Sequence, residues 1–122
     1  MATTQKELGE IGEDMAEKHL LKLGYTILER NWRHHHLEVD LIARDKDELV
    51  IIEVKTRSGV QFGHPSEAIT RQKMNHLINA ADAYIKINNS SLDTRFDVIT
   101  VVMNRGTYRL EHFEDAFYPG LN

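Results

Sequence analysis

The sequence contains no cysteine, only two prolines and one tryptophan among its 122 residues, and no long apolar run. Without cysteine the chain has neither disulfide bonds nor thiolate metal ligands, so a metal site must use oxygen or nitrogen donors. No apolar stretch approaches the roughly 20 residues of a membrane span. The first residues also lack the apolar core of a signal peptide. We therefore expect a cytoplasmic protein without a membrane segment.

An excess of positive charge is also missing, because fifteen Lys and Arg residues stand against nineteen Asp and Glu residues, for a formal net charge of −4. This balance counts against a protein that binds nucleic acid by electrostatics alone, since such proteins are usually basic. It allows a metal-dependent nuclease, because the carboxylates of a metal site carry part of the negative charge. The length fits a single domain over residues 1–122.

Hydrophobic periodicity predicts two helices and five strands. The first helix is expected from Gln5 to Leu23, with Thr3 or Thr4 as its N-cap and Gly24 as its stop. The second helix is expected from Pro65 to Ile87. Strands are expected at residues 25–30, 37–44, 48–57, 95–103 and 108–113, with a polar link at 31–36. The order α-β-β-β-α-β-β predicts a mixed sheet flanked by helices.

The most informative residues lie on two neighbouring strands that a short polar loop at 45–48 joins into a hairpin. With residue 44 opposite residue 49, antiparallel pairing sets Asp40 opposite Glu53 and Glu38 opposite Lys55. Like charges directly opposite each other destabilise a sheet. Two carboxylates with an ammonium on the same face therefore predict a divalent metal site with a catalytic lysine. The alternative is an exposed sheet face with a cross-strand ion pair.

Alternation of side chains along a strand also predicts the apolar faces of this hairpin. One apolar face of the first strand is expected to consist of Val39, Leu41 and Ala43. One apolar face of the second strand is expected to consist of Val50, Ile52 and Val54.

Several segments, taken in order, carry a resemblance to a known family. Glu13 lies in Gly9-x-x-Gly12-Glu13-x-x-Ala16, and Asp40 lies in Glu38-Val39-Asp40-Leu41-Ile42-Ala43. Glu53 lies in Val50-Ile51-Ile52-Glu53-Val54-Lys55-Thr56-Arg57. Further matches are Arg30-Asn31-x-Arg33, Gly63-x-Pro65-x-Glu67-Ala68 with Lys73, and Arg95-Phe96-Asp97-Val98. Together they resemble the PD-(D/E)xK nuclease superfamily. The chain is most similar to its uncharacterised YraN-like family, whose nearest functional relatives look like archaeal Holliday-junction resolvases. Val39 stands where the superfamily name places proline.

The resemblance implies an α/β fold with a restriction-endonuclease-like αβββαβ core, in which the sheet is mixed and flanked by helices. It implies that Asp40, Glu53 and Lys55 are catalytic. Asp40 and Glu53 would bind Mg²⁺ or Mn²⁺, with the Val54 carbonyl and Glu13 as further ligands, and hard oxygen donors suit these ions. Lys55 would act on the attacking water and on transition-state charge. For Glu13, an ordinary glutamate on the helix surface is the alternative.

DNA is the partner that the resemblance implies. Phosphate contacts are expected from four basic residues, for which scattered surface positions are the alternative: Arg30, Arg33, Arg57 and Lys73. Glu38 either pairs with Lys55 or forms a plain surface salt bridge. The run His34–His36 is interpreted as a solvated loop rather than a metal site, and His19 as a packed core histidine. Tyr25 and Trp32 are interpreted as core residues rather than base-stacking platforms.

Two functions from different classes remain open. The first is a metal-dependent endonuclease that hydrolyses DNA phosphodiester bonds, with branched or damaged DNA as the candidate substrate and DNA repair or recombination as the setting. The second is a nucleic-acid-associated binding module that has the nuclease fold and little activity without a partner. A second copy of the chain or another protein would then be that partner.

Overall fold

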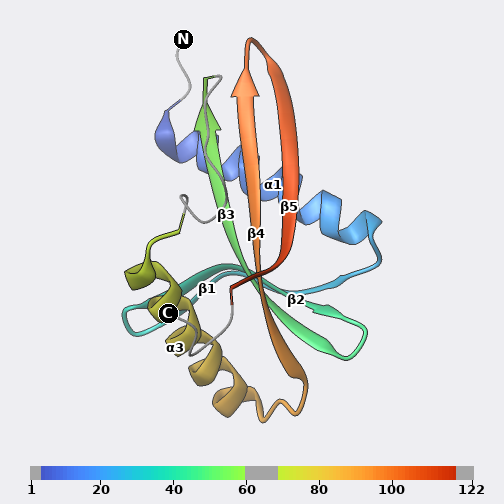
Figure 1. Cartoon of the computed structure of the whole chain (residues 1–122), viewed down its shortest axis with the longest axis vertical. Helices are drawn as coiled ribbons and strands as arrows, with labels where there is room; N and C mark the ends of the chain where they lie inside the picture. Colours follow the sequence, from blue (N-terminus) through green and yellow to red (C-terminus); the bar gives the residue numbers. More distant parts are fainter. Residues whose placement is uncertain (1–3, 60–68, 118–122) are drawn as a thin grey trace.

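The computed structural model describes residues 4–59 and 69–117 of the chain. Within them the elements follow the predicted order (Figure 1): α1(Gln5–Lys22), β1(Thr26–His34), β2(Leu37–Asp45), β3(Glu48–Ser58), α3(Arg71–Asn88), β4(Asp93–Asn104) and β5(Thr107–Phe117). The strands form one sheet in the order β1-β2-β3-β4-β5. Pairing is antiparallel except between β3 and β4, which run parallel. The predicted mixed sheet flanked by helices is confirmed.

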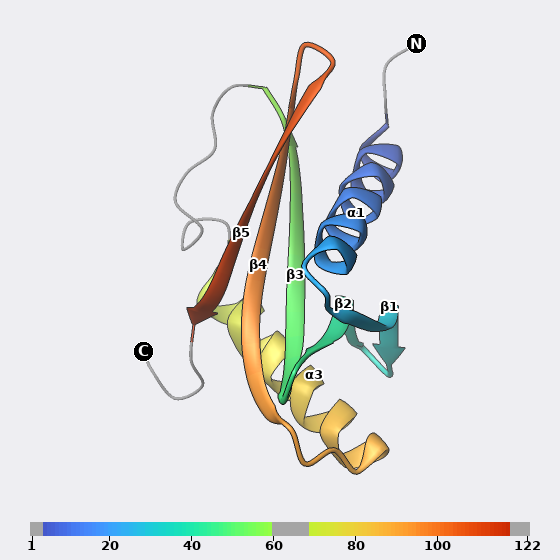
Figure 2. The same cartoon turned by 90° about the vertical axis from the view of Figure 1, so that its right-hand side faces the viewer.

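The two helices cover opposite faces of the sheet. In Figure 1, α3 lies in front of the sheet and α1 passes behind the long strands, and Figure 2 shows α1 beside them. Each helix packs on its own apolar cluster. The α1 cluster includes Ala16, Leu20, Leu41, Ala43, Val50, Ile52 and Ile99. The α3 cluster includes Val39, Ile42, Leu49, Ile51, Leu77, Ala81 and Phe96. The sheet is therefore the middle of three layers.

The helix boundaries follow from capping. The Thr4 side chain caps α1 by accepting the Glu7 N–H at 3.0 Å, and Gly24, with φ of 91°, follows the helix end. The Thr70 side chain caps α3 in the same way, because it accepts the Lys73 N–H at 3.1 Å. The second helix thus begins at Arg71, and the prediction of helix at residues 69 and 70 is wrong. Residues 65–68 of that predicted helix lie outside the described residues.

Strand β1 is longer than the sequence predicts. The expected polar link at 31–36 is wrong for residues 31–34, which continue the strand opposite β2. Within this stretch Asn31 adopts φ of 54°, a left-handed conformation that asparagine tolerates better than most residues. Trp32 pairs with Val39 and packs edge-on against the Tyr84 ring of α3 at 5.3 Å. The hydrophobic packing of Trp32 outweighs the polar character of its neighbours.

Strand β2 leaves its partner β3 part-way along. Pairing between them runs from Asp45–Glu48 through the predicted pair Arg44–Leu49 and ends at Leu41–Ile52, while pairing with β1 continues to the tip of that hairpin. Figure 1 shows the β1–β2 ribbon crossing sideways behind α3. As a result Val39 packs in the α3 cluster, and the prediction that it shares a face with Leu41 and Ala43 is wrong. Strand alternation holds only while the ladder continues.

A buried arginine on the α1 side ties the end of the β2–β3 hairpin to β4. Arg95 is 6% exposed and donates two hydrogen bonds to the fully buried Asp97, at 2.9 and 3.0 Å. It also reaches Asp45 at 3.1 Å and Glu48 at 2.9 Å, at the turn of the hairpin. Burial alone would raise the pKa of Asp97, but hydrogen bonds from His112 and Arg95 outweigh it and lower that pKa. A buried charge is tolerable when it is paired in this way.

The same network reaches α1 through two histidines. His112 of β5 bonds Asp97 at 2.7 Å through Nε2, and its Nδ1 lies 3.0 Å from Nε2 of His19. The prediction that His19 is a packed core histidine holds in part, because its ring packs edge-on against the His112 ring at 5.1 Å but is not fully buried. It is half-buried, and it is held by a polar contact because its helix position faces a polar part of the sheet. Tyr25 and Trp32 do pack against the two apolar clusters, as predicted.

A close approach between α1 and β3 makes Gly12 the sharpest test of this packing. A methyl group at position 12 would overlap the Thr56 hydroxyl and lie 3.0 Å from the Thr56 Cβ, whereas a methyl group at Gly9 has open space. We expect Gly12→Ala to destabilise the protein by about 1–3 kcal/mol, as overpacking does. The matched control Gly9→Ala should gain up to about 1 kcal/mol from helix propensity. Chemical denaturation measures both, and equal effects would contradict the packing described.

Candidate active site

Asp40 lies at the point where β2 departs from β3. Its carboxylate accepts the Val54 N–H at 2.8 Å, so a side-chain oxygen takes the place of a main-chain partner in the ladder. The predicted strand pair Asp40–Glu53 does not form, because regular pairing ends at Leu41–Ile52. The contact nevertheless brings the Asp40 carboxylate to the Glu53-Val54-Lys55 segment.

Glu53 is the most unusual carboxylate of this region. It is 3% exposed and has two cations beside it, with Lys55 Nζ at 3.3 Å and Lys73 Nζ at 3.7 Å from its Oε2. Burial, the charge of Asp40 and a hydrogen bond with it raise the pKa of Glu53 to about 7, although both lysines oppose the shift. Glu53 and Asp40 are thus close enough to repel each other, in a position where water screens them poorly.

Glu13 approaches the same region from α1. Its side chain is 17% exposed and lies 3.6 Å from Nε of Arg30. Burial and the charge of Asp40 raise the pKa of Glu13, while hydrogen bonding to Asn31 and the charge of Arg30 oppose the rise. The helix glutamate is therefore not a solvated surface residue, and it belongs to the electrostatic environment of Asp40.

A divalent cation fits the chemistry of this arrangement. Two carboxylates share one poorly solvated region, and a dication would offset the burial and the charge of Asp40 that raise the pKa of Glu53. Their oxygens, with the adjacent Val54 carbonyl, are the donor type that Mg²⁺ and Mn²⁺ prefer, and Mg²⁺ keeps several waters. Within residues 4–59 and 69–117, no three or more His, Asp or Glu side chains converge as a complete cage. The role of Glu13 as a further ligand stays a prediction.

The four basic residues expected to bind phosphates lie in different surroundings. Arg30 contacts Glu13, Asp14 and Glu17 of α1, so its charge is already balanced. Arg33 is exposed and pairs with Glu38 at 3.3 Å. Arg57 is exposed near the end of β3, two residues beyond Lys55. The structure brings only Lys73 directly to Glu53.

Glu38 forms a plain surface salt bridge, which is one of its two expected alternatives, and the histidine run differs from expectation in part. Glu38 pairs with Arg33 rather than Lys55, because β2 has already left β3 at that point. His34 belongs to β1 and stacks on Trp32 at 6.0 Å, so a solvated loop is the wrong description for it. His36 faces the His76 ring of α3 at 6.2 Å. Sequence reasoning missed His76, whose only signal is its position one helical turn after Lys73.

Comparison with known proteins identifies relatives over nearly the whole chain. The family model described as "Uncharacterised protein family UPF0102" matches residues 12–101. A UPF0102 protein of Bacteroides thetaiotaomicron is 46% identical over 115 residues, which cover 94% of this chain and 95% of the relative. UPF0102 proteins of Bacteroides fragilis and Flavobacterium psychrophilum are 46% and 45% identical, over 93% and 92% of this chain and 94% of each relative. The matched span contains Glu13, Asp40, Glu53 and Lys55.

The raised pKa of Glu53 predicts a pH dependence of stability. Between its ordinary pKa of 4.5 and about 7, the folded state retains a proton that the unfolded chain has released. The free energy of unfolding should therefore fall as pH rises through this window, by up to about 3 kcal/mol. In metal-free buffer, Glu53→Gln should remove this fall, and the exposed control Glu38→Gln should keep it. Parallel pH profiles of parent and Glu53→Gln in urea denaturation would contradict the placement of Glu53.

Proposed function

The chain belongs to the uncharacterised protein family UPF0102, and from its site we propose a metal-dependent endonuclease that hydrolyses DNA phosphodiester bonds. The observation that carries the proposal is the convergence of Asp40 and Glu53 with Lys55 at a sheet position where regular pairing has ended. This is the carboxylate and lysine set that the PD-(D/E)xK resemblance implies for a nuclease. Branched or damaged DNA is the substrate class that we propose from the likeness to junction resolvases.

In this proposal the chain's own residues have separate tasks. Asp40 and Glu53 would hold Mg²⁺ or Mn²⁺, which when bound supplies a Lewis acid and a more acidic water. Lys55 lies on the same face as Glu53 and is about one-third exposed, so its ammonium can contact both the site and a substrate. It would orient the attacking water and offset the negative charge that develops in the transition state. Glu13 would act on Asp40 from the side of α1.

The alternative proposal is a binding module with little activity of its own. One observation favours it: Arg30 is held by three carboxylates of α1, so the basic surface near the site is smaller than the sequence suggests. A homodimer or a protein partner would then complete the DNA-binding surface.

No helix in the described part of the chain is long and apolar enough to cross a membrane.

The first test of the proposed function concerns metal binding. Mn²⁺ or Mg²⁺ at about 100 times its dissociation constant should stabilise the parent by about 2.7 kcal/mol, because it binds only the folded state. Asp40→Asn should remove most of this gain, since asparagine keeps an oxygen for the Val54 N–H but loses the charge. The control Asp82→Asn changes an exposed aspartate that pairs with Lys86 on α3, and it should respond to metal like the parent. A parental melting temperature that metal does not change would contradict the site.

The second test concerns chemistry. Lys55→Ala should reduce the single-turnover rate of cleavage of a labelled DNA junction or flap by at least about 100-fold, while metal and DNA binding stay largely intact. The reason is that Lys55 acts on charge that exists only in the transition state. Lys55→Arg should rescue poorly, because arginine does not release a proton near neutral pH and its planar group is shaped differently.

The matched control for this test is Lys86→Ala, which removes an exposed lysine of α3. It should cleave at the parental rate. A parental rate in Lys55→Ala would remove the catalytic assignment of that residue. Failure of the parent to cleave junction, flap, single-stranded or duplex DNA with either metal would favour the binding module.

A further inference from the structure

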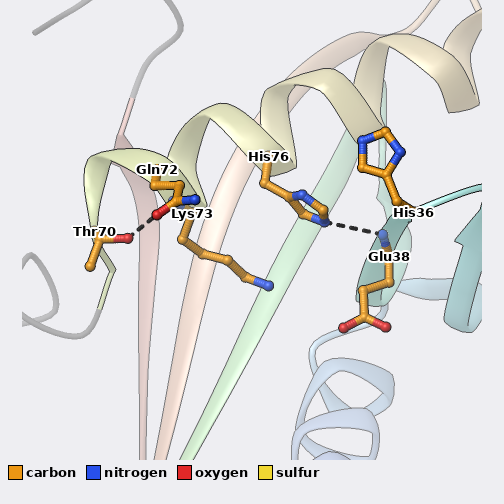
Figure 3. Close-up of a pocket in the computed structure, with 6 residues that line it drawn as sticks. All are labelled: His36, Glu38, Thr70, Gln72, Lys73 and His76. Carbon is orange, nitrogen blue, oxygen red and sulfur yellow. Dashed lines mark hydrogen bonds between the residues drawn. The ribbon is translucent and has the colours of Figure 1, made fainter.

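A pocket of about 330 Å³ adjoins the candidate active site on the α3 side of the sheet. It lies between the start of β2 and the first turns of α3, as Figure 3 shows. Its lining residues come from both elements and from the turn before β2: His36, Glu38, Thr70, Gln72, Lys73 and His76. Lys73 belongs to both places, because its Nζ also lies 3.7 Å from Glu53. The pocket and the candidate active site therefore share one side chain, that of Lys73.

The lining is rich in hydrogen-bond donors. Lys73 contributes an ammonium. The Glu38 main-chain N–H donates to Nε2 of His76 at 3.3 Å, so the neutral His76 ring carries its proton on Nδ1 and can donate from there. The His36 ring lies at 62° to the His76 ring and adds a second imidazole. Gln72 adds an amide, and α3 has no acidic residue in its first turn to weaken the positive potential of its N-terminus.

The one carboxylate among the six lining residues is directed elsewhere. Glu38 lies 3.3 Å from Arg33. In Figure 3 its carboxylate points away from His36 and His76, toward α1. The charge of Glu38 is thus paired largely outside the pocket. The groups that face the pocket are then the ammonium of Lys73 and the two imidazoles.

We propose that this pocket binds a phosphate of the DNA strand that neighbours the phosphate undergoing hydrolysis, with Lys73, His76 and His36 as its ligands. The inference deepens the proposed function and rests on it. A phosphate presents several acceptor oxygens and no donor, so it matches a lining of donors from different directions. Lys73 also supplies the positive charge that an anionic phosphate requires and that an uncharged base does not.

The proposal defines the substrate more narrowly than the chemistry of the site does. A strand that reaches both places must continue for at least one nucleotide beyond the scissile bond, on the side of α3. Phosphate contacts position a strand without reading its sequence. The pocket would therefore determine which phosphodiester bond of the DNA strand lies over Asp40 and Glu53. It would favour hydrolysis of bonds inside a DNA strand over hydrolysis of small compounds that contain a single phosphodiester.

The test measures binding of a labelled oligonucleotide in EDTA, where no cleavage occurs. His76→Ala and Lys73→Gln should each weaken binding by about tenfold, the loss expected for one hydrogen bond to a charged group. Lys73→Gln should also reduce the salt dependence by about one phosphate contact. The controls His35→Ala, in the exposed turn of the same hairpin, and Lys86→Gln, near the far end of α3, should bind like the parent. Melting temperatures check folding, and His76→Gln replaces the alanine variant if the latter is unfolded.

Two further arms separate the possible failures. With metal present, His76→Ala should raise the KM for DNA but leave hydrolysis of bis(p-nitrophenyl) phosphate, which has a single phosphate, at the parental rate. If the parent hydrolyses neither DNA nor bis(p-nitrophenyl) phosphate, the nuclease proposal fails. The binding measurements in EDTA still decide whether the pocket binds a DNA phosphate. Parental DNA affinity in both His76→Ala and Lys73→Gln would overturn the subsite. Binding of inorganic phosphate that needs Lys73 and His76, without any loss of DNA affinity in the variants, would make the pocket a free-anion site and would also overturn it.

Discussion

The hydrogen bond from the Val54 N–H to the Asp40 carboxylate is the constraint on which the candidate site depends. At 2.8 Å it replaces the main-chain pairing that would otherwise continue between β2 and β3. One side chain thereby ends a ladder without leaving a buried N–H unpaired, which would cost free energy. The β1–β2 ribbon is then free to turn away and to carry His36 and Glu38 toward α3. The same bond fixes one carboxylate beside the segment that holds Glu53 and Lys55.

Buried charged residues have different roles on the two faces of the sheet. On the α1 side, Arg95 and Asp97 are buried as a hydrogen-bonded pair that joins the β2–β3 turn, β4 and β5. Removing one partner of such a pair leaves an uncompensated buried charge, which is strongly destabilising. On the other side, Glu53 is buried beside a second carboxylate, and burial and the charge of Asp40 raise its pKa despite the two lysines beside it. The first arrangement is a satisfied network, whereas the second is poised to accept further positive charge.

The fold could be predicted from the sequence because the local sequence signals agree with the overall arrangement of the elements. Caps, apolar periodicity and the polar loop predicted at 45–48, which the structure narrows to a turn at Lys46–Asp47, specify the elements and the register of Arg44 with Leu49. It was insufficient where tertiary contacts override local character. Trp32 extends β1 through polar neighbours by packing on α3, and Asp40 breaks the alternation that predicted a common face for Val39 and Leu41. Glu13, Asp40, Glu53 and Lys55 could be proposed from motif order. His76 could not, because a lone histidine on a helix becomes informative only when the fold sets it opposite β2.

The two lysines explain how the site and the adjoining pocket would depend on each other. In the structure Lys55 and Lys73 both lie against Glu53, so each contributes part of its charge to a carboxylate that burial leaves poorly solvated. A dication at Asp40 and Glu53 would offset part of that charge, so Glu53 would compete less for both lysines, and Lys55 and Lys73 would be more available to the attacking water and to a phosphate in the pocket. Metal occupancy and DNA binding would then reinforce each other, because the metal would compete with Lys73 for Glu53 and the phosphate would compete with Glu53 for Lys73. Such coupling is reciprocal by thermodynamic necessity, so DNA that occupies the pocket would in turn raise the affinity of the carboxylate pair for metal.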